Sequence, residues 1–315
     1  MPESKDQYYI RDYHLGDETA ITALFNIVFG QTLTEAQWRW KYTGMDLAPP
    51  IARLAFKADG QLVGHAGAIT LHGWRQGQSL PFFQICDVMV HPAARGHLGG
   101  RNLFARLFKE LGDRLAGRWP DAFGYGFPGR RPFRLGEYIR AYGRVEQALA
   151  MHRTARSKRL SPIYTRPLTW DDPRLDRLWA RLAPGFGLAL IRDRAFLTWR
   201  YATNPFHTYD LLGFQVAGWL LGWAVVRWAE DRLRVIDLLV PRRCLEPALR
   251  ALDHLAAVGG VDDVEIWLPS SWRAAISGRL EPTEVVVGNM IWRLPIPTTE
   301  VRETLYYTMG DLDIF

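Results

Sequence analysis

The spacing of apolar residues along the chain predicts alternating helices and strands. Ile21, Leu24, Phe25 and Val28 recur at helical spacing, which places one apolar face on a helix over residues 17–29. The pattern then predicts a helix over 34–42, a hairpin over 51–71 that turns at Asp59-Gly60, a strand over 80–90, a helix over 101–116, a strand over 121–127 and a helix over 131–143. This order predicts an α/β fold of the mixed α+β kind.

The second half of the chain repeats the first. The matching features are Trp40-Lys41-Tyr42 with Trp199-Arg200-Tyr201, Gly64 in "LVGHAG" with Gly222 in "LLGWAV", and Asp87 in "CDVMV" with Asp237 in "IDLLV". Because the matches keep the same order, they indicate a duplicated domain. We expect domains over residues 1–155 and 156–315, joined within the basic, proline-containing segment 153–167. The second domain ends in a C-terminal tail.

Charge and hydropathy indicate which kinds of partner and which compartment to expect. The net charge is +6 and is spread along the chain, which suits an anionic cofactor. Zinc-finger spacing and basic heptads are absent, so nucleic acid is not expected as a partner. The longest apolar stretch, residues 216–226, is too short to span a bilayer. Cys86 and Cys244 lie in apolar runs as two unpaired thiols, so we expect a cytoplasmic protein.

The stretch "VMVHPAARGHLGGRNLF" joins a strand to a helix through a glycine-rich turn. Backbone N–H groups in such a turn, followed by a helix N-terminus, bind anions, and glycine lets a phosphate approach the backbone closely. The second copy continues "VPRRCLEPALRALDHL" without a glycine before Gly259. Strand and helix can therefore be joined without the glycines, which favours a phosphate-binding turn in the first copy over a merely connecting one.

A resemblance to a known family rests on this stretch. Val88, Val90, Pro92, Arg95 and Gly96, after a three-stranded meander and before a further strand and helix, resemble the acyl-CoA-binding core of the GNAT acyltransferases. The resemblance implies two tandem GNAT-like domains, the second degenerate, each a mixed and mostly antiparallel sheet flanked by helices. It also implies acetyl-CoA or another acyl-CoA as cofactor, bound by Val88, Met89, Val90, Arg95, Gly96, His97, Leu98, Gly99, Gly100 and Arg101.

The phosphate-binding pattern of the family allows two registers in this sequence. The family has Arg or Gln, then glycine at the third following position and a second glycine or alanine two further on. Counted from Arg95, Leu98 stands at the first glycine and Gly100 at the second. A small insertion would instead place Gly99 and Gly100 at these positions.

Acyl transfer to an amine needs a base, because an alkylammonium with a pKa near 10.4 is almost fully protonated at neutral pH. Asp87, on the strand that enters the turn, is the first candidate. Strand alternation places it on the face of Met89, opposite Val88 and Val90. The alternative is a structural carboxylate, which the matching Asp237 in the copy without the glycine turn favours.

The resemblance also implies a tyrosine that protonates the departing thiolate. Tyr138 and Tyr142 are the candidates, and their spacing predicts that they share a helix face; packing aromatics are the alternative. Arg130, Arg131 and Arg134 cluster at a predicted helix start, where cations are unfavourable, so we expect them to bind the CoA phosphates or an acidic acceptor. His91 and His97 lack a nearby carboxylate or thiolate, and no metal site is expected.

The C-terminal segment "YYTMGDLDIF" leaves two interpretations. In some tandem GNAT relatives the terminal carboxylate reaches the catalytic pocket as a base, a role open here to Phe315, Asp311 or Asp313. The alternative is a tail packed on the surface.

The leading hypothesis is therefore an N-acyltransferase that moves an acetyl or other acyl group from acyl-CoA to an amine of a small-molecule or amino-sugar acceptor, by direct transfer in a ternary complex. The first alternative is a non-catalytic acyl-CoA sensor or scaffold. The second is an aminoacyl-tRNA-dependent transferase. The sequence leaves the oligomeric state open.

Overall fold

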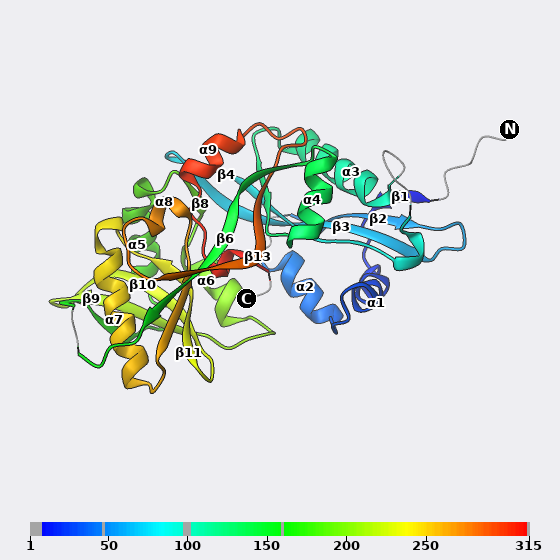
Figure 1. Cartoon of the computed structure of the whole chain (residues 1–315). Helices are drawn as coiled ribbons and strands as arrows, with labels where there is room; N and C mark the ends of the chain where they lie inside the picture. Colours follow the sequence, from blue (N-terminus) through cyan, green and yellow to red (C-terminus); the bar gives the residue numbers. More distant parts are fainter. Residues whose placement is uncertain (1–7, 46–47, 97–101, 159–160, 314–315) are drawn as a thin grey trace. The chain divides into compact units, whose positions relative to one another are not determined.

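The computed structural model describes residues 8–45, 48–96, 102–158 and 161–313 of the chain (Figure 1). Its contacts divide the chain into two units. Unit 1 comprises residues 1–71, 80–145 and 286–298, and unit 2 comprises residues 72–79, 146–285 and 299–315. These units differ from the expected division between residues 155 and 156, because segments on both sides of that position contribute to each unit.

Unit 1 contains a mixed sheet with strand order β1-β2-β3-β4-β5-β13. Strands β4 and β5 pair in parallel, whereas β1–β2, β2–β3 and β5–β13 pair antiparallel. Its elements are β1 (Tyr9–Asp12), α1 (Glu18–Phe29), α2 (Glu35–Thr43), β2 (Ile51–Phe56), β3 (Leu62–Arg75), β4 (Gln78–Val90), α3 (Leu103–Arg118), β5 (Phe123–Gly126), α4 (Arg130–Tyr138), the start of β6 (Tyr142–Thr154) and the end of β13 (Arg279–Met290).

Glycines on β3 allow helices to pack closely on both faces of the unit 1 sheet. A Cβ at Gly64 would lie 2.6 Å from Leu107 of α3, and a Cβ at Gly67 would lie 2.4 Å from the hydroxyl of Tyr42 on α2. Because residues 64 and 67 point to opposite faces of a strand, α3 and α2 cover opposite faces of this sheet (Figure 1). This packing fixes the position of α2 and its side chains against β3.

Unit 2 contains strands of mixed orientation in the order β6-β12-β11-β10-β9-β7. Strands β11 and β12 pair in parallel, and β12–β6, β10–β11, β9–β10 and β7–β9 pair antiparallel. Its further elements are β7 (Tyr164–Pro167), α5 (Arg174–Leu182), β8 (Leu188–Leu190), α6 (Arg194–Leu197), β9 (Asp210–Val216), β10 (Trp219–Trp228), β11 (Arg232–Leu239), α7 (Leu245–Val258), β12 (Asp263–Trp267), α8 (Ser270–Arg273) and α9 (Thr298–Thr304).

The two halves contain a similar order of elements. Strands β1 to β5 with helices α1 to α4 correspond to β7, α5, α6, β9 to β12, α7 and α8, and both halves contain one parallel strand pair. The last strand of each half is exchanged: β13 pairs with β5 of the first half, and β6 pairs with β12 of the second. This exchange explains why the units are not contiguous in the sequence.

One predicted helix is wrong in its extent. The helix expected over residues 131–143 ends at Tyr138, and Tyr142 begins strand β6. Arg140 takes the left-handed conformation with φ of 56°, and the N–H of Ala141 donates to the carbonyl of Gly136. This reversal ends the helix, so Tyr138 and Tyr142 do not share a helix face.

Gly222 of β10, the counterpart of Gly64, is required by a close approach to the backbone. A Cβ there would lie 2.2 Å from the carbonyl oxygen of Leu239. We expect Gly222→Ala to lower the free energy of unfolding by about 1–3 kcal/mol, because the neighbouring strand must shift. Urea denaturation checks this. Gly117→Ala in α3, where a Cβ meets nothing within 4 Å, is the control and is expected to be neutral or stabilising.

Candidate functional site

The first copy contains a cavity of about 490 Å³ beside the end of β4. Three elements distant in sequence line it: the C-terminal end of α1, the segment from β4 to the start of α3, and the first turns of α4. The lining residues are Val28, Phe29, Val88, Met89, Val90, Ala94, Arg95, Gly96, Asn102, Leu103, Phe104, Arg131, Pro132 and Leu135. The wall is mostly apolar with cationic side chains, so it suits a ligand with an apolar part and an anionic part.

The turn after β4 has the features of an anion-binding segment. Gly96 has φ of 130°, a conformation that L side chains rarely adopt, and a Cβ there would meet nothing within 4 Å. Arg95 Nε donates to the carbonyl of Val90 at 2.9 Å. Asn102 caps α3 by accepting from the N–H of Ala105 at 3.3 Å, so the positive end of this long helix lies at the cavity.

Both proposed registers of the phosphate-binding turn depend on residues that lie outside the described part of the chain. These are His97, Leu98, Gly99, Gly100 and Arg101. Their flanking residues Gly96 and Asn102 both line the cavity, as do the predicted cofactor-binding residues Val88, Met89, Val90 and Arg95.

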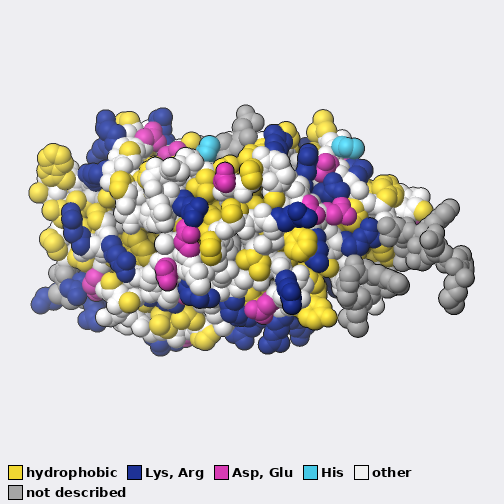
Figure 2. Space-filling view, turned by 90° about the horizontal axis from the view of Figure 1, so that it is seen from above, with side chains coloured by type: hydrophobic (Ala, Val, Ile, Leu, Met, Phe, Trp, Pro, Cys, Tyr) yellow, Lys and Arg dark blue, Asp and Glu magenta, His cyan; other side chains and the backbone are white. Residues whose placement is uncertain are grey.

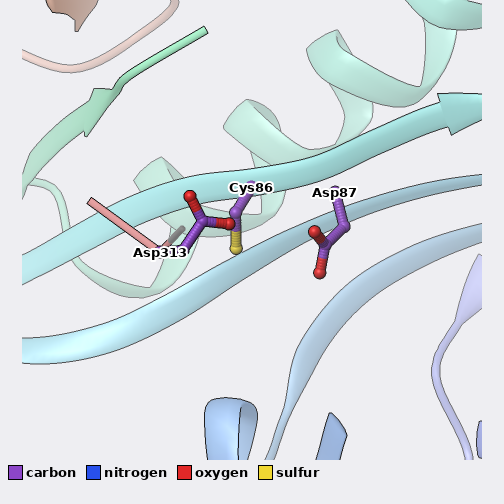
Figure 3. Close-up of side chains that lie close together, drawn as sticks. All are labelled: Cys86, Asp87 and Asp313. Carbon is purple, nitrogen blue, oxygen red and sulfur yellow. The ribbon is translucent and has the colours of Figure 1, made fainter. Parts of the chain in front are cut away.

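Asp87 breaks the regular alternation of β4. Its φ of 50° lies in the left-handed region, and its side chain lies on the same side of the strand as that of Cys86 (Figure 3). The hydroxyl of Tyr42 therefore contacts both, at 2.7 Å from Asp87 Oδ2 and 3.4 Å from Cys86 Sγ. The left-handed residue interrupts the alternation between Cys86 and Asp87, and the placement of Asp87 with Met89, opposite Val88 and Val90, stays a prediction.

The carboxylate of Asp87 is held in place by two side chains of α2. Lys41 Nζ lies 2.9 Å from each carboxylate oxygen, and Tyr42 donates its hydroxyl. The side chains of Asp87 and Lys41 are 6% and 8% exposed, so the pair is buried. Burial and the Asp87 charge raise the pKa of Tyr42 well above its ordinary value, which keeps the phenol protonated as a donor. Such an arrangement is typical of a structural carboxylate.

The two candidate tyrosines lie in different environments. Tyr138 is the last residue of α4 and is 76% exposed. Tyr142 is buried on β6, where its ring stacks on Phe133 and meets Phe108 edge to face. Tyr138 follows the cavity-lining residue Leu135 by three positions, which places both on one face of α4.

Arg130, Arg131 and Arg134 are exposed on the first two turns of α4, and Arg131 lines the cavity. Within the described residues, Arg131 and Arg134 have no ion-pair partner. On the face that Figure 2 shows, charges of both signs are interspersed. The cationic start of α4 is therefore available to an anion at the cavity.

The second copy repeats the tyrosine–aspartate bond in a fully buried setting. Tyr201 donates its hydroxyl to Asp237 Oδ2 at 2.8 Å, as Tyr42 does to Asp87. Here the cation is Arg192, whose Nε lies 3.0 Å from Asp237 Oδ1 and which also pairs with Asp311. Burial, opposed by Arg192 and assisted by the nearby Asp237 charge, raises the pKa of Asp311 to about 6.

The C-terminal segment forms part of the core of unit 2. Residues 305–312 are buried, and Thr308 donates its hydroxyl to Asp237 at 2.9 Å. Arg200 donates to the carbonyls of Gly310 and Leu312. The surface-packed tail is therefore wrong for this segment, because its side chains complete a buried ionic network. Asp311 is engaged within that network; Phe315 lies outside the described residues.

Lys41 and His65 are the functional candidates that sequence reasoning missed. The repeat of Lys41-Tyr42 with Arg200-Tyr201 was a usable signal for a partner of Asp87. The contact of His65 with Asp87 depends on the register between β3 and β4 and on a left-handed residue, which the amphipathic pattern does not show. Cys86 and Cys244 are both free thiols; Cys86 is buried, whereas Cys244 is half-buried although its apolar run suggests burial.

Comparison with known proteins supports the fold. Residues 9–143 match the model of the acetyltransferase (GNAT) domain. The amino-acid sequence matches no curated protein. None of the helices in the described residues combines the length and apolar character needed to cross a membrane.

Solved structures of acyltransferases share the fold over most of both chains. A probable N-acyltransferase from Enterococcus faecalis aligns with a TM-score of 0.67 at 16% identity, over 91% of this chain and 73% of that one. A GCN5-related N-acetyltransferase from Anabaena variabilis gives a TM-score of 0.66 at 14% identity, over 90% and 72%. The N-myristoyltransferase of Saccharomyces cerevisiae, with bound myristoyl-CoA, gives 0.58 at 12%, over 92% and 80%. At these identities the likeness shows the fold.

Proposed function

We propose that the protein is an acyl-CoA-dependent N-acyltransferase whose first copy binds the acyl-CoA, since residues 9–143 match the model of the acetyltransferase (GNAT) domain. The observation that carries the proposal is the cavity at the end of β4. It combines an apolar wall with Arg95, Arg131 and the N-terminal end of α3, which matches a molecule with an acyl-pantetheine arm and phosphates. Acetyl-CoA is the proposed donor.

The acceptor is proposed to be an amine of a small molecule or an amino sugar. Direct transfer within a ternary complex is supported by the setting of Cys86, which is buried against the hydroxyl of Tyr42 rather than exposed as a nucleophile. Val88, Met89, Val90 and the turn at Gly96 would hold the donor, and Arg131 would contact its anionic part.

Tyr138 is the proposed proton donor to the departing thiolate. Its exposed hydroxyl and its place one turn beyond Leu135 support this role over Tyr142, whose ring is buried in the core. For Asp87, the bonds from Lys41 and Tyr42 favour a positioning role over that of general base. Because these bonds engage the carboxylate of Asp87, they also favour a second candidate function, that of a non-catalytic acyl-CoA sensor.

A thiol-release assay separates the two functions. Acetyl-CoA is incubated with the protein and a panel of amines, including glucosamine and spermidine, and free CoA is measured with a thiol reagent. We expect Tyr138→Phe to lower kcat by about 10²–10⁴-fold with unchanged acetyl-CoA affinity, since proton transfer contributes roughly that factor. Tyr9→Phe, on the exposed face of β1, is the matched control. Acetyl-CoA binding without thiol release for any amine would support the sensor.

A further inference from the structure

We propose that His65 is a positioning residue of the acyl-transfer site, which holds the main-chain carbonyl of Asp87 and thereby fixes the cavity-lining segment 88–90. The proposal concerns the site of the proposed function and rests on it for its effect on acyl-CoA. Three observations carry it: a strained residue, a buried hydrogen bond and an internal comparison between the two copies.

The strained residue is Asp87. A φ of 50° in a non-glycine residue within a strand costs conformational free energy, so surrounding contacts must hold it. Its carboxylate is held by Lys41 and Tyr42 of α2. These bonds fix the side chain, but they leave the orientation of the peptide group that follows Asp87 to another contact.

His65 of β3 supplies that contact. Its ring is fully buried, and Nδ1 lies 2.7 Å from the carbonyl oxygen of Asp87. Because a carbonyl oxygen only accepts, Nδ1 carries the hydrogen, and Nε2 is the unprotonated nitrogen. Burial lowers the pKa of His65 below its ordinary value, which keeps the ring neutral at neutral pH. Within the described residues Nε2 has no hydrogen-bond partner, so the bond to Asp87 is the polar contact of this ring.

The left-handed backbone at Asp87 affects the three residues that follow it. Val88, Met89 and Val90 all line the cavity. Because the side chains of Cys86 and Asp87 lie on one side of the strand, the left-handed residue sets which face of β4 each following residue occupies. If the carbonyl of Asp87 is released, we expect φ to relax to the extended region and residues 88–90 to shift at the cavity wall.

The second copy provides an internal comparison. Trp223 stands at the position of His65, directly after the matched glycines Gly64 and Gly222. Asp237, the counterpart of Asp87, is not among the described residues with positive φ. The histidine, the left-handed aspartate and the glycine-rich turn thus occur together in the first copy. In the second copy, a tryptophan replaces the histidine, the aspartate has no positive φ and the turn has no glycines. Packing alone would not require these three differences to occur together.

The experiment compares His65→Asn with His65→Leu. The Asn side-chain amide can replace the Nδ1–H donor, whereas Leu keeps the bulk and removes the donor. By calorimetric titration with acetyl-CoA, we expect His65→Leu to bind about tenfold or more weakly and His65→Asn within about threefold of the wild type. Thermal unfolding of each variant separates this effect from a loss of stability. His72→Leu, exposed on the same strand, is the control and is expected to bind normally.

Two ligand-free measurements keep the inference distinct from the proposed function. Amide hydrogen exchange at residues 88–90 is expected to accelerate in His65→Leu and not in His65→Asn. Nitrogen NMR shifts of wild-type His65 are expected to show Nδ1 protonated and Nε2 unprotonated. Unchanged exchange and acetyl-CoA affinity in a folded His65→Leu protein, or the opposite tautomer in the wild type, would overturn the role of His65. Absence of acetyl-CoA binding by the wild type would instead refute the proposed function.

Discussion

Replacing Arg192 by leucine is expected to lower the free energy of unfolding by about 3–5 kcal/mol, because it leaves buried carboxylates without their cation. Arg192 is fully buried and bonds both Asp237 and Asp311, which are 0% and 3% exposed. Through Asp311 it also ties the C-terminal segment into unit 2. Chemical denaturation followed by circular dichroism measures the loss.

The control for Arg192 is an exposed ion pair of the same chemical type. Arg194 lies 3.4 Å from Asp176, and the two side chains are 46% and 48% exposed. Arg194→Leu is expected to cost no more than about 1 kcal/mol, since exposed pairs contribute little. Equal effects of the two substitutions would contradict the assignment of the C-terminal segment to a buried ionic network.

Replacing Leu135 by tryptophan is expected to weaken acetyl-CoA binding by about tenfold or more, which corresponds to roughly 1.4 kcal/mol. Leu135 is half-buried on α4 and lines the cavity, so the larger ring enters the space proposed for the ligand. Because Leu135 is only half-buried, the melting temperature should stay close to that of the wild type. Calorimetric titration measures the affinity.

A matched substitution outside the cavity controls for the added indole ring. Leu280 of β13 is 47% exposed and does not line the cavity. Leu280→Trp is expected to bind acetyl-CoA like the wild type. Unchanged affinity in Leu135→Trp would place the ligand elsewhere.

The spacing of apolar residues predicts most of the helices and strands of unit 1. The helix expected over 17–29 is α1, and the hairpin turn at Asp59-Gly60 joins β2 to β3, with Gly60 at φ of 85°. These elements depend on local sequence, so their amphipathic pattern decides them. The helix expected to end at residue 143 was wrong because its end is set by a left-handed Arg140, a residue type with no preference for that conformation.

The exchange of last strands could not be predicted from spacing. The apolar pattern of β6 and of β13 predicts a strand, but it does not show whether that strand pairs within its own half of the chain or with the other half. The partner is chosen by long-range packing, such as the pairing of Gly288 with Gly126. The internal repeat can be recognised in the sequence because short motifs match between the halves. The division into two units cannot, because it depends on which strands pair.

The candidate site was predicted in part. The segment from Val88 to Gly96 was identified from its glycine turn and lines the cavity. Val28 and Phe29 contribute from a helix more than fifty residues earlier, and an amphipathic pattern does not say which helix end meets which strand. Asp87 was identified, but its left-handed backbone and its bonds to Lys41 and His65 arise from tertiary contacts.

Hydrogen exchange with and without acetyl-CoA tests the central claim most directly, because it reports both binding and its place in the chain. We expect acetyl-CoA to slow exchange in peptides that cover residues 88–96, 102–104 and 131–135, with no protection in the matching β11–α7 region of the second copy. Protection confined to the second copy, or none at millimolar acetyl-CoA, would contradict the assignment of the acyl-CoA site to the first copy.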